Sequence, residues 1–160
     1  MEEQAKALAD GIEAALPAWV ERSVEAVLVA WRGAADPTVL GAAREAGVRA
    51  RSDVGGRVRA LLEGDVDEQR STPLSILRDA VRYPTEVLRA AGVPPVERDD
   101  FATACFPSDD YGLTPASLAD LDPALVEAGI AWGAAKAWTH KQRHGAGTGP
   151  ALPPENRSQP

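Results

Sequence analysis

The sequence has little cysteine and no long apolar run, and each shortage excludes a class of protein. Cys105 is the only cysteine, so no disulfide can form within the chain. A reducing compartment fits this composition best. The acidic amino terminus lacks the basic start and the apolar segment of a secretory signal. No stretch approaches the roughly 18 consecutive apolar residues of a membrane span. We therefore expect a cytoplasmic protein without a membrane span.

Positive charge is also scarce. The chain has 17 Lys and Arg against 24 Asp and Glu, which gives a net charge of −7 and a pI near 4.8. Lysine occurs only at Lys6, Lys136 and Lys141. Proteins that bind nucleic acid through its phosphates usually carry a basic surface. The charge balance therefore argues against a nucleic-acid partner.

The motifs of well-known enzyme classes are missing as well. The sequence contains no P-loop, no dinucleotide-binding glycine pattern, no C-x-x-C pair and no set of kinase motifs. These absences remove every specific argument for catalysis, although they do not exclude an enzyme. We expect no cofactor and no resident metal.

What the sequence does contain is helical periodicity. From Glu3 to Trp31 apolar residues recur at steps of three and four, interrupted by Pro17, which predicts either a kink or a new helix. The same steps continue from Pro37 to Leu62, where the pair Gly55-Gly56 weakens the helix. A last helix is expected from about Pro123 to Arg143.

Short polar residues followed by proline recur between these segments. Such pairs are suited to the start of a helix, because the side-chain oxygen accepts from free backbone N–H groups and proline fits the first turn. The four pairs are Asp36-Pro37, Thr72-Pro73, Thr114-Pro115 and Asp122-Pro123. We interpret their hydroxyls and carboxylates as helix caps rather than as nucleophiles. Tyr83 precedes Pro84, which disfavours a helical Tyr83 and predicts a separate short helix from Pro84 to Ala91.

These patterns together predict an all-α fold, a single compact bundle of about five to seven helices. Its helical domain would span 1–144, with an N-terminal pair at 3–63 and a C-terminal cluster at 72–144. The charged linker DVDEQRS separates the two. Residues 145–160 contain little apolar content and four prolines, which is typical of a disordered tail.

Part of the chain resembles a known family. The segments RSTPLSILRDAVRYPTEVLRAAGVPPVERDDF, YGLTPASLADLD and WGAAKAW are similar to a family of small, uncharacterised actinobacterial proteins. The resemblance covers residues 70–138. It implies no activity, because none is assigned to that family, and it suggests that the carboxyl half is the defining unit.

Acidic residues gather between Val93 and Ala124, where Arg98 is the only cation. The carboxylates are Glu97, Asp99, Asp100, Asp109, Asp110, Asp120 and Asp122. Three interpretations stay open: a solvated loop with helix caps, a docking surface for a basic partner, and a divalent-metal site. The residue order of a calcium-binding loop is not present. The docking interpretation selects Asp99, Asp100, Asp109, Asp110 and Tyr111.

Two histidines and one cysteine complete the candidate residues. His140 and His144 are four apart and would share one helical face, a spacing that can bind zinc. HKQRH lacks the glutamate of the H-E-x-x-H motif, and no third ligand is evident, so a basic last turn that complements the helix dipole is the alternative. Cys105, flanked by Phe101 and Phe106, is expected to be a buried small apolar residue.

Small residues and arginines leave further alternatives open. The segment AWGAAKAW would let another helix approach closely, either within the domain or in a homodimer. Arg44, Arg51 and Arg59 cluster loosely on one side of their helix. They are expected to be solvated, to contact the acidic loop of this chain or of a second copy, or to contact nucleic acid.

The function predicted from the sequence is a non-enzymatic cytoplasmic interaction or regulatory module. Its acidic region would dock an unknown, basic protein partner. The alternative is a small metal-dependent protein or enzyme that uses Asp109, Asp110 and a histidine.

Overall fold

The structure, a computed structural model, describes residues 1–145 of the chain. Every regular element in these residues is helical and none is a strand, which confirms the predicted all-α class. The predicted disordered tail begins at Gly145, which the structure instead places at the end of a helix, and residues 146–160 lie outside the described residues.

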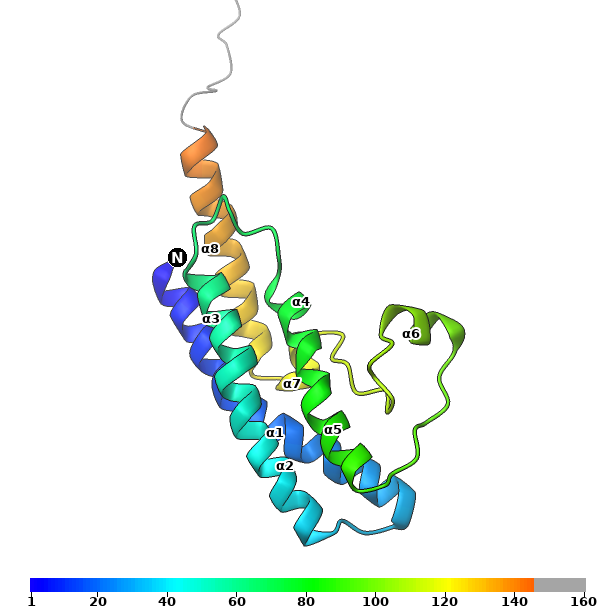
Figure 1. Cartoon of the computed structure of the whole chain (residues 1–160). Helices are drawn as coiled ribbons and strands as arrows, with labels where there is room; N and C mark the ends of the chain where they lie inside the picture. The colour runs from blue at the N-terminus through cyan, green and yellow to red at the C-terminus, as the bar shows by residue number, and fades with distance from the viewer. Residues whose placement is uncertain (146–160) are drawn as a thin grey trace, which may run out of the picture.

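The longest helix, α1 (Glu2–Arg32), is the centre of the fold. It contacts α2, α3, α5, α7 and α8. Its buried face carries the predicted apolar residues, including Leu8, Ile12, Leu16, Val20 and Val24. The helix continues through Pro17 without a break, and Figure 1 shows that its axis changes direction along its length. No new helix begins at Pro17, and the helix that contains it is bent.

A second long helical stretch packs along α1. It consists of α2 (Pro37–Ala50), a π-helical turn η1 (Arg51–Gly55) and α3 (Gly56–Glu63). Asp36 caps α2, as predicted, by accepting from the N–H of Thr38 at 2.8 Å. The glycine pair does not break the stretch. Gly55 is instead buried against Glu13, where a Cβ atom would lie 2.9 Å from the Glu13 side chain.

A third stretch covers the other side of α2. It comprises α4 (Pro73–Leu77), a 3₁₀ segment η2 (Arg78–Val81) and α5 (Arg82–Ala90). Thr72 caps α4 by accepting from the N–H of Ser75, as predicted. The prediction that Tyr83 leaves the helical region is wrong. Tyr83 is buried and its hydroxyl donates to Asp53 at 2.6 Å, and this tertiary packing outweighs the steric preference before a proline.

The end of α5 is a Schellman motif built on Gly92. Gly92 has a φ of 77°, in the left-handed region that favours glycine. The N–H of Gly92 donates to Arg89 and the N–H of Val93 donates to Leu88. Gly92 therefore ends α5 within one residue of the predicted end at Ala91.

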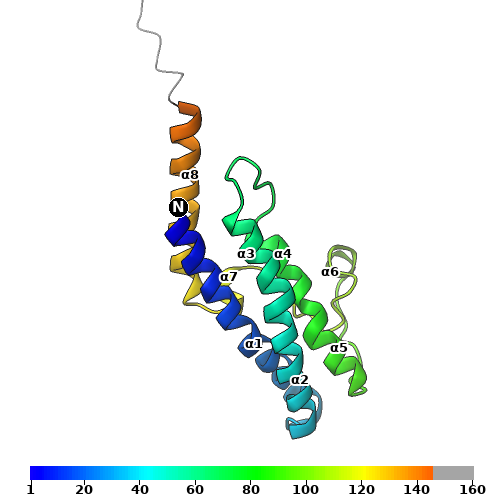
Figure 2. The ribbon, with the colours of Figure 1, turned by 60° about the vertical axis from the view of Figure 1, so that its left-hand side comes forward.

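The remaining elements are α6 (Asp100–Cys105), α7 (Leu118–Leu121) and α8 (Leu125–Gly145). In Figures 1 and 2, α6 stands apart from the other helices on long connections, and α8 lies beside the start of α1. Asp122 accepts from the N–H of Ala124 just before α8, as its cap-like sequence predicted.

Two local predictions in this region are wrong. Thr114-Pro115 starts no helix, because the Thr114 hydroxyl donates to Asp109. The next helix, α7, begins later and is capped by Ser117 in a capping box with Asp120. Cys105 is exposed rather than buried, because none of the residues of α6 is buried.

Within residues 1–145, no helix combines the length and the apolarity that crossing a membrane would require.

Candidate metal centre

The connection between α3 and α4 is ordered by its own side chains. The Gln69 amide donates to the carbonyl groups of Leu61 at 2.9 Å and Gly64 at 2.7 Å, at the end of α3. Val66 is buried beneath the connection. Lys136 of α8 donates to the carbonyl group of Gln69 at 3.3 Å. The backbone around Asp67 is thereby held against α8.

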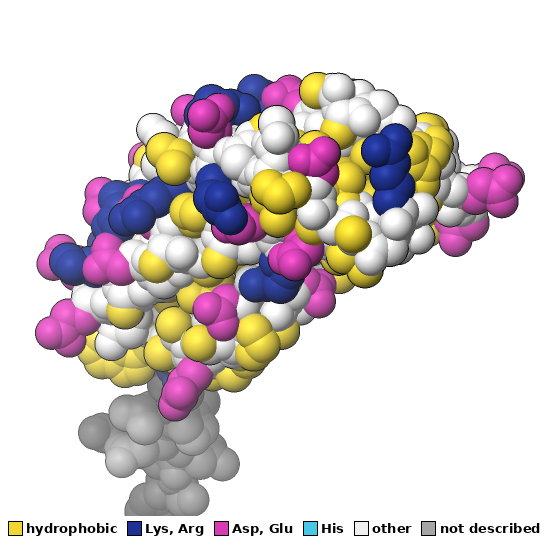
Figure 3. Space-filling model, turned by 90° about the horizontal axis from the view of Figure 1, so that it is seen from below, with side chains coloured by type: hydrophobic (Ala, Val, Ile, Leu, Met, Phe, Trp, Pro, Cys, Tyr) yellow, Lys and Arg dark blue, Asp and Glu magenta, His cyan; other side chains and the backbone are white. Residues whose placement is uncertain are grey.

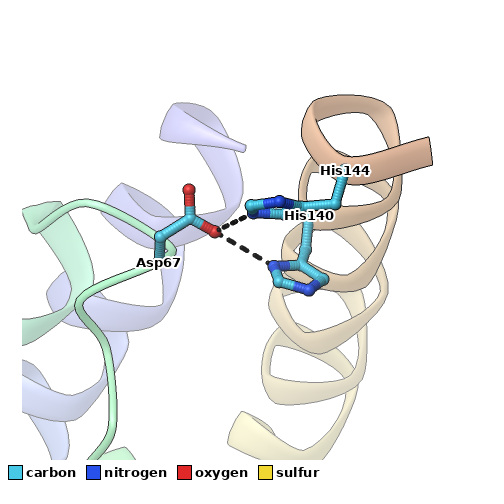
Figure 4. Close-up of side chains that lie close together, drawn as sticks. All are labelled: Asp67, His140 and His144. Carbon is cyan, nitrogen blue, oxygen red and sulfur yellow. Dashed lines mark hydrogen bonds and ion pairs between the residues drawn. The ribbon is translucent and has the colours of Figure 1, made fainter. Parts of the chain in front are cut away.

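Asp67 meets both histidines of the chain (Figure 4). Its Oδ1 atom lies 3.0 Å from Nδ1 of His140 and 2.8 Å from Nε2 of His144. One donor atom from each of the three residues lies within 4.8 Å of the other two. The two imidazole rings are close as well, with centroids 4.4 Å apart. The predicted shared face of the histidines is confirmed, and Asp67 is a third side chain that could hold a metal ion with them, which the sequence did not reveal.

Two further charged residues, Arg143 and Asp65, lie next to Asp67. Arg143 Nη1 lies 2.6 Å from Asp65 Oδ1 and 3.3 Å from Asp67 Oδ2. The backbone N–H of Asp67 donates to Asp65 at 2.9 Å, which orients the loop. Hydrogen bonding from His144 lowers the pKa of Asp67 to about 2, although partial burial opposes the shift. Asp67 is therefore ionised at neutral pH, the form in which a carboxylate binds metal.

The arrangement has the donor chemistry of a transition-metal site. Two imidazole nitrogens and one carboxylate oxygen suit Zn²⁺ and related divalent ions, and three protein ligands leave a position open. The site is at the surface, since the side chains of His140 and His144 are 59% and 57% exposed. A water molecule or a group from another molecule can therefore reach a bound ion.

The carboxylate that reaches the histidines is Asp67, not Asp109 or Asp110 as the sequence suggested. Asp109 is only 3% exposed. It accepts from the N–H groups of Leu113 and Thr114, both at 2.8 Å. Burial raises the pKa of Asp109, but these hydrogen bonds outweigh it and hold the pKa below its ordinary value. Asp109 is thus a structural residue of its loop.

The predicted docking residues are divided by the structure. Tyr111 is buried and donates to the carbonyl group of Val93, so it presents no side chain to a partner, and neither does Asp109. Asp110 forms an ion pair with Arg89. Asp99 and Asp100 remain exposed, although Asp99 also caps α6. Figure 3 shows acidic side chains projecting at the end of the molecule where α6 lies.

Sequence reasoning missed Asp67 because it treated the linker only as a boundary between two helical groups. The available signal was the pair Asp65 and Asp67, which flank Val66 in an otherwise polar segment. Nothing local connects that pair to histidines 73 and 77 residues further along the chain.

Comparisons of this chain with protein families, with curated proteins and with solved structures find no match. The actinobacterial resemblance therefore stays a prediction.

Proposed function

We propose that this protein is a helical module that binds a divalent transition-metal ion, with Zn²⁺ as the reference ion, through Asp67, His140 and His144. The observation that supports it is the convergence of two imidazole nitrogens on one carboxylate oxygen, at 3.0 and 2.8 Å. Such an ion would replace the two hydrogen bonds by three metal–ligand bonds.

A bound ion would connect the α3–α4 connection to α8. The two segments already touch through Lys136 and Gln69, so only small side-chain movements are needed to close the three ligands around an ion. The open fourth position faces solvent and can accept a ligand from a partner protein. We infer a regulatory interaction module whose binding surface depends on a bound metal ion. This function combines the interaction module and the metal-dependent protein that the sequence left as alternatives.

The test is a zinc titration of the full chain, in competition with a chromophoric chelator. We expect one equivalent to bind. Replacing a ligand, as in His140→Ala, His144→Ala or Asp67→Asn, should weaken binding by more than the roughly 10–100-fold effect typical of losing an outer-shell partner. Asp99→Asn is the matched control, because it removes an exposed carboxylate that is not one of the three clustered residues, and it should leave the affinity unchanged.

Two additional measurements make the test specific. Co²⁺ should give the absorption spectrum of a four-coordinate site. Since the chain has only two histidines, the imidazole NMR signals report on this site alone, and both should shift on adding Zn²⁺. Absence of binding, or equal binding by the His140→Ala/His144→Ala protein, would leave an ordinary surface contact between histidines and an aspartate.

A second candidate function is docking of a basic protein partner by α6. It is supported by Asp99, Asp100 and the neighbouring Phe101, whose side chain is 77% exposed. An Asp99→Asn/Asp100→Asn variant should lose partners that the wild type retains in a pull-down from the native host. A variant of a distant exposed acid, Glu25→Gln, should retain them. Identical partners for all three proteins would contradict the docking function.

A further inference from the structure

Helix α8 has apolar side chains on two opposite faces. The inner face packs on α1 through Leu125 and Trp132, which are buried. Ile130 and Trp138 lie on the outer face and are 68% and 64% exposed. Figure 2 shows α8 at an edge of the molecule. A surface helix normally carries its polar residues on the side away from the core, so this outer face is unusual.

The outer face can be defined by helical geometry. Between Val126 and Lys141, at about 100° per residue, eight exposed positions lie within about 80° of Ala134. They are Val126, Glu127, Ile130, Ala131, Ala134, Ala137, Trp138 and Lys141. Only Glu127 and Lys141 of this set are charged. The positions 127, 130, 134, 137 and 141 follow alternating steps of three and four, which is the spacing of a coiled-coil seam.

The residues of this face are arranged symmetrically about Ala134. Ile130 and Trp138 are each four residues from it, on opposite sides. Glu127 and Lys141 are each seven residues from it. A helix with this pattern is complementary to itself when the second helix runs in the opposite direction.

We propose that the outer face of α8 binds the same face of a second copy of this chain, antiparallel and with the two-fold axis beside Ala134. In this arrangement Ile130 packs against Trp138 of the second copy. Glu127 faces Lys141 of the second copy, and the same pair forms again on the other side of the axis. The small side chain of Ala134 lets the two helices approach closely at the axis.

Charge distinguishes this arrangement from its alternatives. A parallel pair would place Glu127 opposite Glu127 and Lys141 opposite Lys141, which is repulsive. It would also align the two helix dipoles unfavourably. A two-fold contact uses one patch on both subunits, so a self-complementary face is the feature that a homodimer requires. The proposal does not rest on metal binding.

Sedimentation velocity of the full chain over a range of concentrations tests the proposal. We expect a reversible dimer. Trp138→Asp should raise the dissociation constant on the order of thirtyfold or more, because it places a charge where a central aromatic side chain packs. Val48→Asp is the matched control, since Val48 is 65% exposed on α2, and it should leave the dimer unchanged. Circular dichroism should show the same helix content for all three proteins.

Charge reversal tests the antiparallel geometry. Glu127→Lys alone and Lys141→Glu alone should each weaken the dimer. The protein that carries both changes should recover it, because each lysine again faces a glutamate. In a Cys105→Ser background, Ala134→Cys should form a disulfide between two chains under oxidising conditions.

Three results would overturn the proposal. The first is a wild-type chain that stays monomeric at every concentration. The second is equal weakening of the dimer by Val48→Asp and Trp138→Asp. The third is a double charge reversal that is weaker than either single change. An Asp67→Asn protein that loses zinc binding but keeps the dimer would show that dimerisation is independent of the metal site.

Discussion

Gly47 of α2 packs directly against Pro17 of α1. A Cβ atom at Gly47 would lie 2.9 Å from Cα of Pro17 and 3.1 Å from its carbonyl oxygen. The absence of a side chain at Gly47 therefore lets the two longest helical stretches approach closely at the proline of α1. The two residues are 30 positions apart, and neither identity by itself indicates the contact.

Gly47→Ala should destabilise the protein by about 1–3 kcal/mol, because the added methyl group meets backbone atoms that cannot rotate away. Gly41→Ala in the same helix is the control, since a Cβ atom there has no neighbour within 4 Å. That change should stabilise the helix by up to about 1 kcal/mol. Urea unfolding of both variants measures the difference. A Gly47→Ala protein as stable as the wild type would contradict the close contact.

Thr72→Ala should lower stability by about 1 kcal/mol, because α4 loses the side-chain oxygen that accepts from the N–H of Ser75. Ser71→Ala changes the neighbouring exposed hydroxyl and should have an effect within about 0.5 kcal/mol. Thermal and urea unfolding check both changes. Equal effects would mean that the cap contributes nothing.

Asp109→Asn should lower stability at neutral pH by about 1.5–3 kcal/mol, the range for hydrogen bonds to a charged group. The folded-state pKa of Asp109 lies below its ordinary value, so its contribution is present above the unfolded pKa of about 3.9. The contribution is lost as the pH falls through the folded-state pKa. The stability difference between wild type and variant should therefore narrow on acidification below about pH 4. A difference that stays constant with pH would contradict the role of the ionised carboxylate.

The Tyr83 hydroxyl should resist ionisation. Burial, and then the hydrogen bond to Asp53, raise the pKa of Tyr83 to about 12. Because Tyr83 is then neutral in the folded state, stability is complete below the unfolded pKa of about 10 and decreases as the pH rises towards 12. In a Tyr111→Phe variant the tyrosinate absorbance reports Tyr83 alone, since the chain has two tyrosines. Titration near pH 10 in the folded protein would contradict this environment.

Thr85→Val should leave stability unchanged or increase it by about 1 kcal/mol. The Thr85 hydroxyl is buried without a hydrogen-bond partner, and valine has the same shape without the cost of an unsatisfied polar group. Thr85→Ser keeps the hydroxyl and removes a methyl group, so it should be destabilising. Unfolding curves of the two variants give the comparison, and a strongly destabilised Thr85→Val protein would show that the hydroxyl has a partner.

The sequence by itself determined the helical class, the buried face of α1 and the helix starts at Asp36 and Thr72. These features depend on groups within a few residues of one another, such as a capping oxygen and the N–H groups of the next turn. The shared face of His140 and His144 could be predicted for the same reason, because it follows from the helical repeat alone.

Only the tertiary structure decided the features that join distant segments. It placed Asp67 beside histidines 73 and 77 positions away, buried Tyr83 against Asp53 and left Cys105 exposed on a helix that stands apart. It also directed the Thr114 hydroxyl to Asp109 instead of a helix start. For Tyr83 the free energy of tertiary packing exceeds the local preference, whereas the position of Asp67 and the exposure of Cys105 depend on how distant segments come together, which a local sequence pattern does not record.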